Sequence, residues 1–134
     1  MALRKGFRQL VDEAKSRIKT LTLDEARAKH SRPDVLFVDL RDVRELEREG
    51  QIPGAFHCPR GMLEFWIDPD SPYYKDAFAP GKELVFFCNA SWRSALAADT
   101  AQQMGVEHVS EMDGGFTAWK KAGLPVEERP KKKA

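Results

Sequence analysis

Residues 84–94 read Leu84-Val85-Phe86-Phe87-Cys88-Asn89-Ala90-Ser91-Trp92-Arg93-Ser94. Four apolar residues, typical of a buried strand, run directly into a cysteine and then into a short loop before a helix-like stretch. At such a turn the backbone N–H groups of the loop converge into an anion-binding nest, and the positive end of the helix dipole points the same way. Both effects lower the pKa of a thiol, and Arg93 adds a positive charge beside the loop. The pattern therefore predicts a reactive thiol at Cys88, against the simpler interpretation of a buried strand-end cysteine.

The same succession of strand and helix recurs along the chain. Predicted strands cover residues 35–39, 55–58, 83–87 and 108–111, and predicted helices cover residues 4–17, 22–28, 44–49, 62–67, 73–78, 93–104 and 117–121. The strand at 35–39 is apolar on both faces, as a buried parallel strand is. We therefore predict an α/β fold with a mostly parallel central sheet and helices on both faces.

The chain has 134 residues, the usual size of one domain. Near the N-terminus apolar residues recur at helical spacing, at Phe7, Leu10, Val11, Ala14 and Ile18. This spacing predicts an amphipathic helix within residues 1–17 that packs on the domain. Residues 18–127 are expected to form the domain, and residues 128–134, which include Lys131-Lys132-Lys133, a disordered basic tail.

Charge and composition exclude several classes of function. There are 22 basic and 21 acidic residues, so no general positive field for nucleic acid or membrane is expected. The apolar runs are about five residues long, far below the roughly 20 that span a bilayer. Two cysteines without a secretory segment predict a cytoplasmic location, where a free thiol is stable. The three histidines lack metal-ligand spacing, so neither a metal nor a cofactor is implied.

Four separated motifs resemble those of the rhodanese (sulfurtransferase) family. They are Asp39-Leu40-Arg41-Asp42, Gly50-Gln51-Ile52-Pro53-Gly54-Ala55, the C-x4-R-S loop at 88–94, and Gly114-Gly115-Phe116-Thr117-Ala118-Trp119 followed by Ala122-Gly123-Leu124-Pro125. Residues 57–65 are similar to those of small bacterial single-domain members. The resemblance implies a rhodanese-like fold for residues 18–127.

The resemblance also implies a reaction. The Cys88 thiolate would attack the outer sulfur of a small anionic donor such as thiosulfate, leaving sulfite and a persulfide. Cyanide, a thiol or a protein partner would then remove that sulfur, with ping-pong kinetics. The loop Asn89, Ala90, Ser91, Trp92, Arg93 and Ser94 would hold the persulfide, mainly through backbone amides. No general base is obligatory if the thiol is already ionised.

Individual side chains of the loop have separate expected roles. Arg93 would fix the loop, attract the anionic donor, or do both, and Ser94 would cap the following helix or donate into the loop. Trp92 would either line the mouth of the pocket or pack the loop against residues 62–65. Ser91 stands where the family commonly has glycine, so positive φ would cost about 1 kcal/mol there, or its hydroxyl would contribute to the pocket.

Three candidate supporting residues lie outside the loop. We expect Asp39 and Arg41 to hold neighbouring loops by an ion pair or hydrogen bonds rather than to take part in the chemistry. Arg60 is a weaker candidate for binding the donor, against the interpretation of an ordinary surface arginine. Cys58 is interpreted as a small core hydrophobe, the alternative being a resolving cysteine that attacks oxidised or persulfidated Cys88.

Two other classes of function remain as alternatives. Rhodanese-like folds resemble the cell-cycle dual-specificity phosphatases, and a phosphatase or arsenate reductase would use a longer C-x5-R loop around a larger anion. Residues 88–93 have the C-x4-R count, which favours sulfur over phosphate. A non-catalytic regulatory or binding module of the family would usually lack the cysteine.

Overall fold

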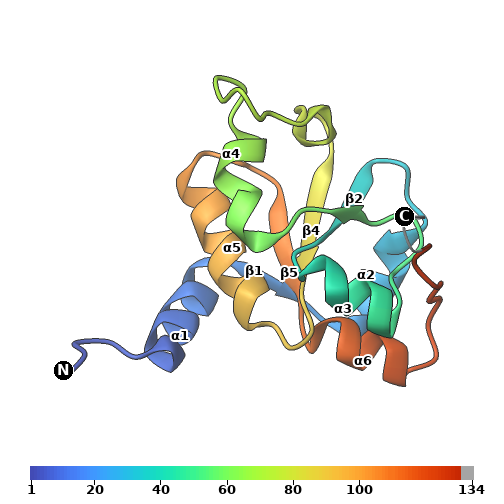
Figure 1. The fold of residues 1–134 in the computed structure, drawn as a ribbon, viewed down its shortest axis with the longest axis horizontal. Helices are drawn as coiled ribbons and strands as arrows, with labels where there is room; N and C mark the ends of the chain where they lie inside the picture. The colour runs from blue at the N-terminus through green and yellow to red at the C-terminus, as the bar shows by residue number, and fades with distance from the viewer. Residues whose placement is uncertain (131–134) are drawn as a thin grey trace.

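A five-stranded parallel sheet forms the centre of the molecule (Figure 1). The computed structural model describes residues 1–130, and the lysines at 131–133 of the expected tail lie outside the described residues. The strands are β1 (Lys19–Leu21), β2 (Val35–Asp39), β3 (Phe56–His57), β4 (Glu83–Phe87) and β5 (Val109–Met112), in the order β1-β5-β4-β2-β3. Every pair of neighbours is parallel, which confirms the predicted fold class.

Within residues 1–130, six α-helices surround the sheet. They are α1 (Phe7–Arg17), α2 (Leu23–His30), α3 (Val43–Glu49), α4 (Leu63–Ile67), α5 (Trp92–Gln103) and α6 (Gly115–Lys121). Two single-turn 3-10 helices, η1 (Arg60–Met62) and η2 (Asp76–Phe78), lie in the connections. A capping box opens α2, since Glu25 N–H donates to Thr22 Oγ1 at 3.1 Å and Thr22 N–H donates to Glu25 Oε1 at 3.0 Å.

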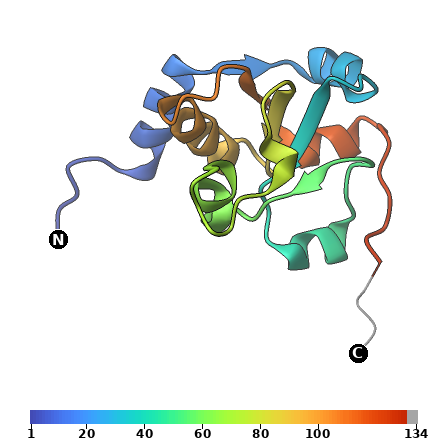
Figure 2. The same cartoon turned by 90° about the horizontal axis from the view of Figure 1, so that it is seen from above.

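Helices cover both faces of the sheet (Figure 2). Each face carries a separate hydrophobic cluster. Along β4, Leu84 and Phe86 pack with residues of α4 and α5, whereas Val85 and Phe87 pack with residues of α2 and α6. This alternation follows from the two-residue period of a strand. On the outer side of α5, helix α1 adds a smaller cluster of Val11, Ala14 and Ala95.

Several predicted boundaries are wrong for local reasons. Strand β1 was not predicted, because three residues at a sheet edge carry too short a pattern. Helix α1 begins at Phe7 rather than at residue 4, since Gly6 is extended and acts as its N-cap. The helix expected at 73–78 is reduced to the single turn η2, and the strand expected at 55–58 to the two residues of β3.

The carboxyl ends of the strands meet at one edge of the sheet. Leu40 N–H donates to Phe87 O at 2.9 Å, and Cys58 N–H donates to Asp39 O at 2.9 Å. The residues that follow β2, β3 and β4 are thereby brought side by side, with Cys88 among them. A cavity of about 630 Å³ lies at the opposite side of the sheet, near the amino ends of β4 and β5, where Leu84 and His108 contribute to its lining.

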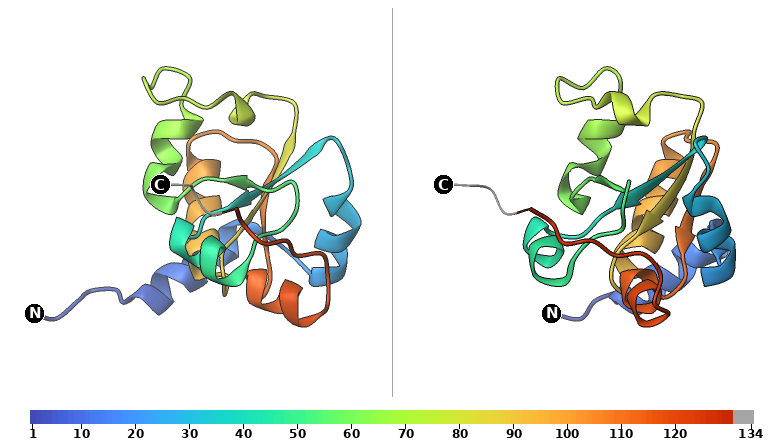
Figure 3. Two further views of the ribbon diagram at one scale, coloured as in Figure 1. Left: turned by 45° about the vertical axis from the view of Figure 1, so that its right-hand side comes forward. Right: turned by 90° about the vertical axis from the view of Figure 1, so that its right-hand side faces the viewer.

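The end of the described chain returns to the domain (Figure 3). Glu127 forms an antiparallel bridge with Gln51, and Arg129 Nη1 donates to Gln51 Oε1 at 3.2 Å. The expected tail was residues 128–134. Its first residues, 128–130, therefore lie beside the connection between α3 and β3. None of the helices within residues 1–130 has the length and apolarity to cross a membrane.

Candidate active site

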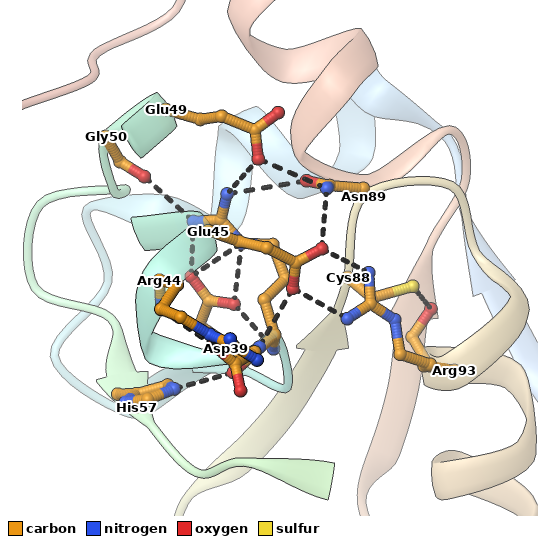
Figure 4. A network of polar contacts seen from close by, with 12 residues as sticks. Asp39, Arg44, Glu45, Glu49, Gly50, His57, Cys88, Asn89 and Arg93 are labelled. Carbon is orange, nitrogen blue, oxygen red and sulfur yellow. Dashed lines mark hydrogen bonds and ion pairs between the residues drawn. The ribbon is translucent and has the colours of Figure 1, made fainter. Parts of the chain in front are cut away.

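Cys88 directly follows β4, and three residues separate it from the start of α5 at Trp92 (Figure 4). The residue is only 1% exposed, and its Sγ lies 3.6 Å from Ser94 Oγ in the first turn of α5. The sequence correctly predicted this strand-to-helix turn. In this contact the thiol donates to the Ser94 hydroxyl, and a reactant would reach the sulfur across a very small exposed surface.

Ser91 adopts the left-handed conformation that its position in the loop requires. Its φ is 81°, and it is the one non-glycine residue with positive φ among residues 1–130. Its hydroxyl donates to Met112 O at 3.1 Å and accepts from Gly114 N–H at 3.0 Å. The side chain thus joins the loop to the connection between β5 and α6, a position that favours a structural role over a contribution of the hydroxyl to the pocket.

The N-terminus of α6 holds the other side of the loop. Phe116 N–H donates to Cys88 O at 2.7 Å, and Thr117 N–H donates to Asn89 O at 3.2 Å. This approach requires glycine at 115, because a Cβ there would collide with Cys88 O and come within 2.8 Å of the Asn89 carbonyl carbon. Its φ of 57° also favours glycine. The double glycine therefore shapes the loop, a role that the sequence motif alone did not reveal.

Arg93 is paired with a carboxylate that the sequence did not predict as part of the site. Its Nη1 lies 2.8 Å from Glu45 Oε2, and its Nη2 donates to Glu45 Oε1 at 3.1 Å. The ion pair raises the pKa of Arg93, which neighbouring Cys88 also raises. The same pair lowers the pKa of Glu45. Asn89 Nδ2 donates to Glu45 Oε1 at 3.2 Å and to Glu49 Oε2 at 3.3 Å, so the Asn89 side chain points toward α3.

Asp39 and Arg41 form the predicted ion pair, completely inside the protein. Arg41 Nη2 lies 2.8 Å from Asp39 Oδ2 and donates to Gly50 O at 2.9 Å, and the two side chains are 0% and 1% exposed. The guanidinium also stacks on the Phe116 ring, 4.0 Å from its centroid, and Arg41 Nη1 donates to Asn89 Oδ1 at 3.4 Å. The pair joins the ends of β2 and α3 to the Cys88 loop.

Trp92, Ala90 and Arg60 lie at the surface of the site. Trp92 is 48% exposed, and its ring contacts Phe7 of α1 with centroids 4.8 Å apart, a contact that the sequence did not predict. Ala90 is exposed at the tip of the loop. Arg60 forms an ion pair with Glu64 at 2.9 Å, as an ordinary surface arginine does. Arg60 therefore does not present a free charge to a donor.

Cys58 belongs to the hydrophobic core. It is 0% exposed, packs with Val38, Leu40 and Leu63, and burial raises the pKa of its thiol to about 12. It follows β3, which is two strands away from β4, so its Cα lies roughly 10 Å from that of Cys88 at the usual strand spacing. A disulfide needs less than about 7 Å. The resolving-cysteine alternative therefore requires movement of the backbone.

A buried glutamate completes the site. Glu111 of β5 is 0% exposed, and its Oε1 accepts a hydrogen bond from Ser94 Oγ at 2.8 Å. Nothing in the sequence marks it beyond an acidic residue inside a short strand. Cys88, Ser94 and Glu111 thus form a continuous chain of polar contacts from β4 through α5 to β5. Within residues 1–130, no group of three or more histidine, cysteine and acidic side chains could hold a metal ion.

Similarity to known proteins agrees with this geometry. Residues 22–122 match the family described as Rhodanese-like domain. A sulfurtransferase from Allochromatium vinosum is 30% identical over 93 residues, which are 69% of this chain and 78% of that protein. The polysulfide-sulfur transferase homodimer of Wolinella succinogenes has a TM-score of 0.69 and 29% identity, over 92% of this chain and 88% of that one.

A further solved structure is more similar still. It is a protein of unknown function and possible tyrosine phosphatase from Rhodopseudomonas palustris. The two chains are 53% identical with a TM-score of 0.92, and the match covers 95% of this chain and 98% of that one.

Proposed function

Because this chain belongs to the rhodanese-like domain family, we propose that it transfers a sulfane sulfur through a persulfide on Cys88. The observation that carries the proposal is the position of the Cys88 sulfur, held at a strand-to-helix turn with the Ser94 hydroxyl 3.6 Å away. A sulfurtransferase and a polysulfide-sulfur transferase among the similar proteins support the same chemistry.

The first half-reaction forms the persulfide. The Cys88 thiolate attacks the outer sulfur of thiosulfate, a new S–S bond forms, and the old S–S bond breaks with its electron pair leaving on sulfite. The product is a cysteine persulfide anion, and the total charge does not change. Partial positive charge at the start of α5 and the Ser94 hydroxyl stabilise that anion.

The second half-reaction regenerates the thiolate. A nucleophile such as cyanide, a thiol or a protein thiolate attacks the terminal sulfur of the persulfide, and the S–S electron pair returns to Cys88. Since Cys88 is only 1% exposed, the site favours donors and acceptors that present a narrow end, as thiosulfate and polysulfide do. We propose a cytoplasmic location, because a reducing compartment keeps the thiol and its persulfide functional.

Arg93 acts mainly by fixing the loop. Its guanidinium forms a bidentate ion pair with Glu45, so the carboxylate largely neutralises the positive charge that an incoming donor would meet. Arg41 supports the same loop through Asn89 and Phe116 without reaching the surface. Binding of the donor therefore depends on the loop backbone and the start of α5 more than on a free arginine.

Steady-state kinetics test the proposal. Thiosulfate and cyanide should give thiocyanate with parallel double-reciprocal plots, the signature of a ping-pong reaction. Cys88→Ser should abolish turnover, whereas Cys58→Ala should retain most of it. Turnover by Cys88→Ser at the wild-type rate would eliminate the proposal.

A phosphatase is the second candidate, because a possible tyrosine phosphatase is 53% identical to this chain. The C-x4-R loop at 88–93 is one residue short of the C-x5-R loop that encloses phosphate, so we expect negligible hydrolysis of aryl phosphates. Efficient hydrolysis by the wild type, lost in Cys88→Ser, would favour this candidate over sulfur transfer.

A further inference from the structure

Glu111 is an acidic side chain inside the protein with only half of its carboxyl group hydrogen-bonded. It lies on β5 between Thr20 of β1 and Phe86 of β4, and it is 0% exposed. Ser94 Oγ donates to its Oε1 at 2.8 Å, while no group among residues 1–130 hydrogen-bonds its Oε2. An ionised carboxylate in such a place lacks the donors that a buried charge needs.

The surroundings of Glu111 favour its neutral form. Burial is the largest influence and raises the pKa of this carboxyl group. Ser94 of α5, Thr20 of β1, Lys15 of α1 and Ser91 of the loop lower the pKa by less. Lys15 is the one charged member of this set.

The hydroxyl of Ser94 is shared between the sulfur and the carboxyl group. It lies 3.6 Å from Cys88 Sγ and 2.8 Å from Glu111 Oε1. A hydroxyl has one proton to donate, so it cannot donate to a sulfur anion and a carboxylate at the same time. If the sulfur is anionic and Ser94 donates to it, the contact with Oε1 requires a proton on Glu111.

We propose that Glu111 is a positioning residue of the active site, which as a neutral carboxylic acid donates to Ser94 so that Ser94 donates to the anionic sulfur of Cys88. The proton balance is internal. When the thiol ionises beside an ionised Glu111, its proton passes to Ser94 Oγ while the hydroxyl proton of Ser94 passes to Glu111 Oε1. In this exchange the negative charge moves from carboxylate to sulfur, and no proton leaves the protein. Where Glu111 is already neutral, ionisation of the thiol releases its proton to the solvent, and Glu111 keeps its own proton.

The same arrangement applies to the persulfide anion, and that part of the inference rests on the proposed function. The inference about the Cys88 thiolate does not rest on the proposed function, because it concerns only the enzyme before any sulfur is bound. The pH dependence of Cys88 alkylation by iodoacetamide, followed by mass spectrometry of the Cys88 peptide, therefore tests the inference without any sulfur transfer.

The wild-type alkylation rate should rise with pH in two steps, because two coupled groups titrate together. Glu111→Gln carries an amide that donates permanently, so its rate should rise in one step and exceed the wild-type rate about tenfold near neutral pH. Ser94→Ala removes the shared hydroxyl and should slow the alkylation of Cys88 near neutral pH. Asp113→Asn makes the same charge change at an exposed position just after β5 and should keep the two-step profile.

A Glu111→Gln profile that coincides with that of the wild type would overturn the inference. Carbon-13 NMR of the glutamate carboxyl groups in the wild-type protein provides a second measurement if that variant does not fold. The inference predicts one carboxyl that titrates well above the others and is coupled to alkylation of Cys88, and its absence would also overturn it. If the alkylation profile has two steps but thiosulfate loads no sulfur onto the protein, the proposed function is contradicted and the inference about Glu111 stands.

Discussion

Glu45 of α3 holds Arg93 of α5 with two hydrogen bonds, and this pair closes one side of the Cys88 loop. The Nη1–Oε2 and Nη2–Oε1 distances are 2.8 and 3.1 Å, and the two side chains are 19% and 38% exposed. Helix α3 therefore sets where the loop arginine lies. The cation that sequence analysis expected to fix the loop, attract the donor, or do both is paired with a carboxylate of the protein itself.

We expect the Arg93–Glu45 pair to contribute about 1 kcal/mol to the free energy of unfolding, as partly exposed pairs with good geometry do. A double-mutant cycle with Arg93→Ala and Glu45→Gln measures this energy by denaturant unfolding. Arg44→Ala, which breaks the more exposed pair with Asp42, is the control and should leave the free energy of unfolding nearly unchanged.

The stabilisation by the Arg93–Glu45 pair should decrease at acidic pH. Arg93 lowers the pKa of Glu45 in the folded chain, so the stabilisation is complete above the ordinary carboxyl pKa of about 4.5. It is lost as the pH falls through the lowered value. A coupling energy that stays constant down to the acid transition would contradict this account of the pair.

The two cysteines should differ strongly in reactivity. Burial raises the pKa of Cys58 to about 12, so its thiol stays neutral and enclosed at pH 7. Iodoacetamide should therefore modify Cys88 in the native protein long before Cys58, as peptide mass spectrometry would record. Cys58→Ala should lower stability by about 1 kcal/mol through the lost packing. Equal labelling rates for both thiols would show that the loop does not activate Cys88.

Substitutions at Ser91 should separate backbone strain from hydrogen bonding. Ser91→Gly relieves about 1 kcal/mol of strain at φ 81° but loses the two hydrogen bonds to Met112 O and Gly114 N–H. Its stability should lie within about 1 kcal/mol of the wild type. Ser91→Ala keeps the strain and loses both bonds, so it should be less stable by about 2 kcal/mol.

Both Ser91 variants should retain sulfur transfer, because the hydroxyl binds the β5–α6 connection. Thermal unfolding and thiocyanate assays measure the two properties separately. A hundredfold loss of turnover in both variants would mean that the hydroxyl serves the reaction.

Gly115→Ala should damage the loop more than any ordinary glycine substitution. The new Cβ would collide with the backbone of Cys88 and Asn89, which cannot move aside as a flexible side chain would. We expect a loss of about 3 kcal/mol or more and little remaining activity. Gly123→Ala is the matched control, since its φ of 76° is also positive but no atom lies within 4 Å. It should cost about 1 kcal/mol, and equal losses would disprove the packing argument.

The sequence predicted those parts of the molecule whose signals are local. The apolar run of β4, the loop and α5 follow one another within residues 83–103, so pattern and capping define them without the rest of the fold. The ion pair of Asp39 and Arg41 was also accessible, because the partners are two residues apart. The three-residue strand β1 carries too little pattern to be recognised.

Partners that are distant in the sequence were missed. Glu45 is 48 residues from Arg93, and Glu111 is 17 residues from Ser94, so only the folded sheet brings them together. A charged residue within a short strand usually predicts an exposed face, and burial of Glu111 follows from the neighbouring strands on both sides. The sequence therefore predicts the strand-to-helix turn that carries Cys88, whereas the acidic side chains that contact this loop and its helix are found only in the folded structure.

Intact-protein mass spectrometry tests the persulfide on Cys88 most directly. After incubation with thiosulfate, the wild-type protein should gain the mass of one sulfur atom, and cyanide should remove that mass as thiocyanate. Cys58→Ala should behave in the same way, and Cys88→Ser should gain nothing. Sulfur retained on Cys88→Ser at the wild-type level would contradict the account, because the transferred atom would then be carried elsewhere.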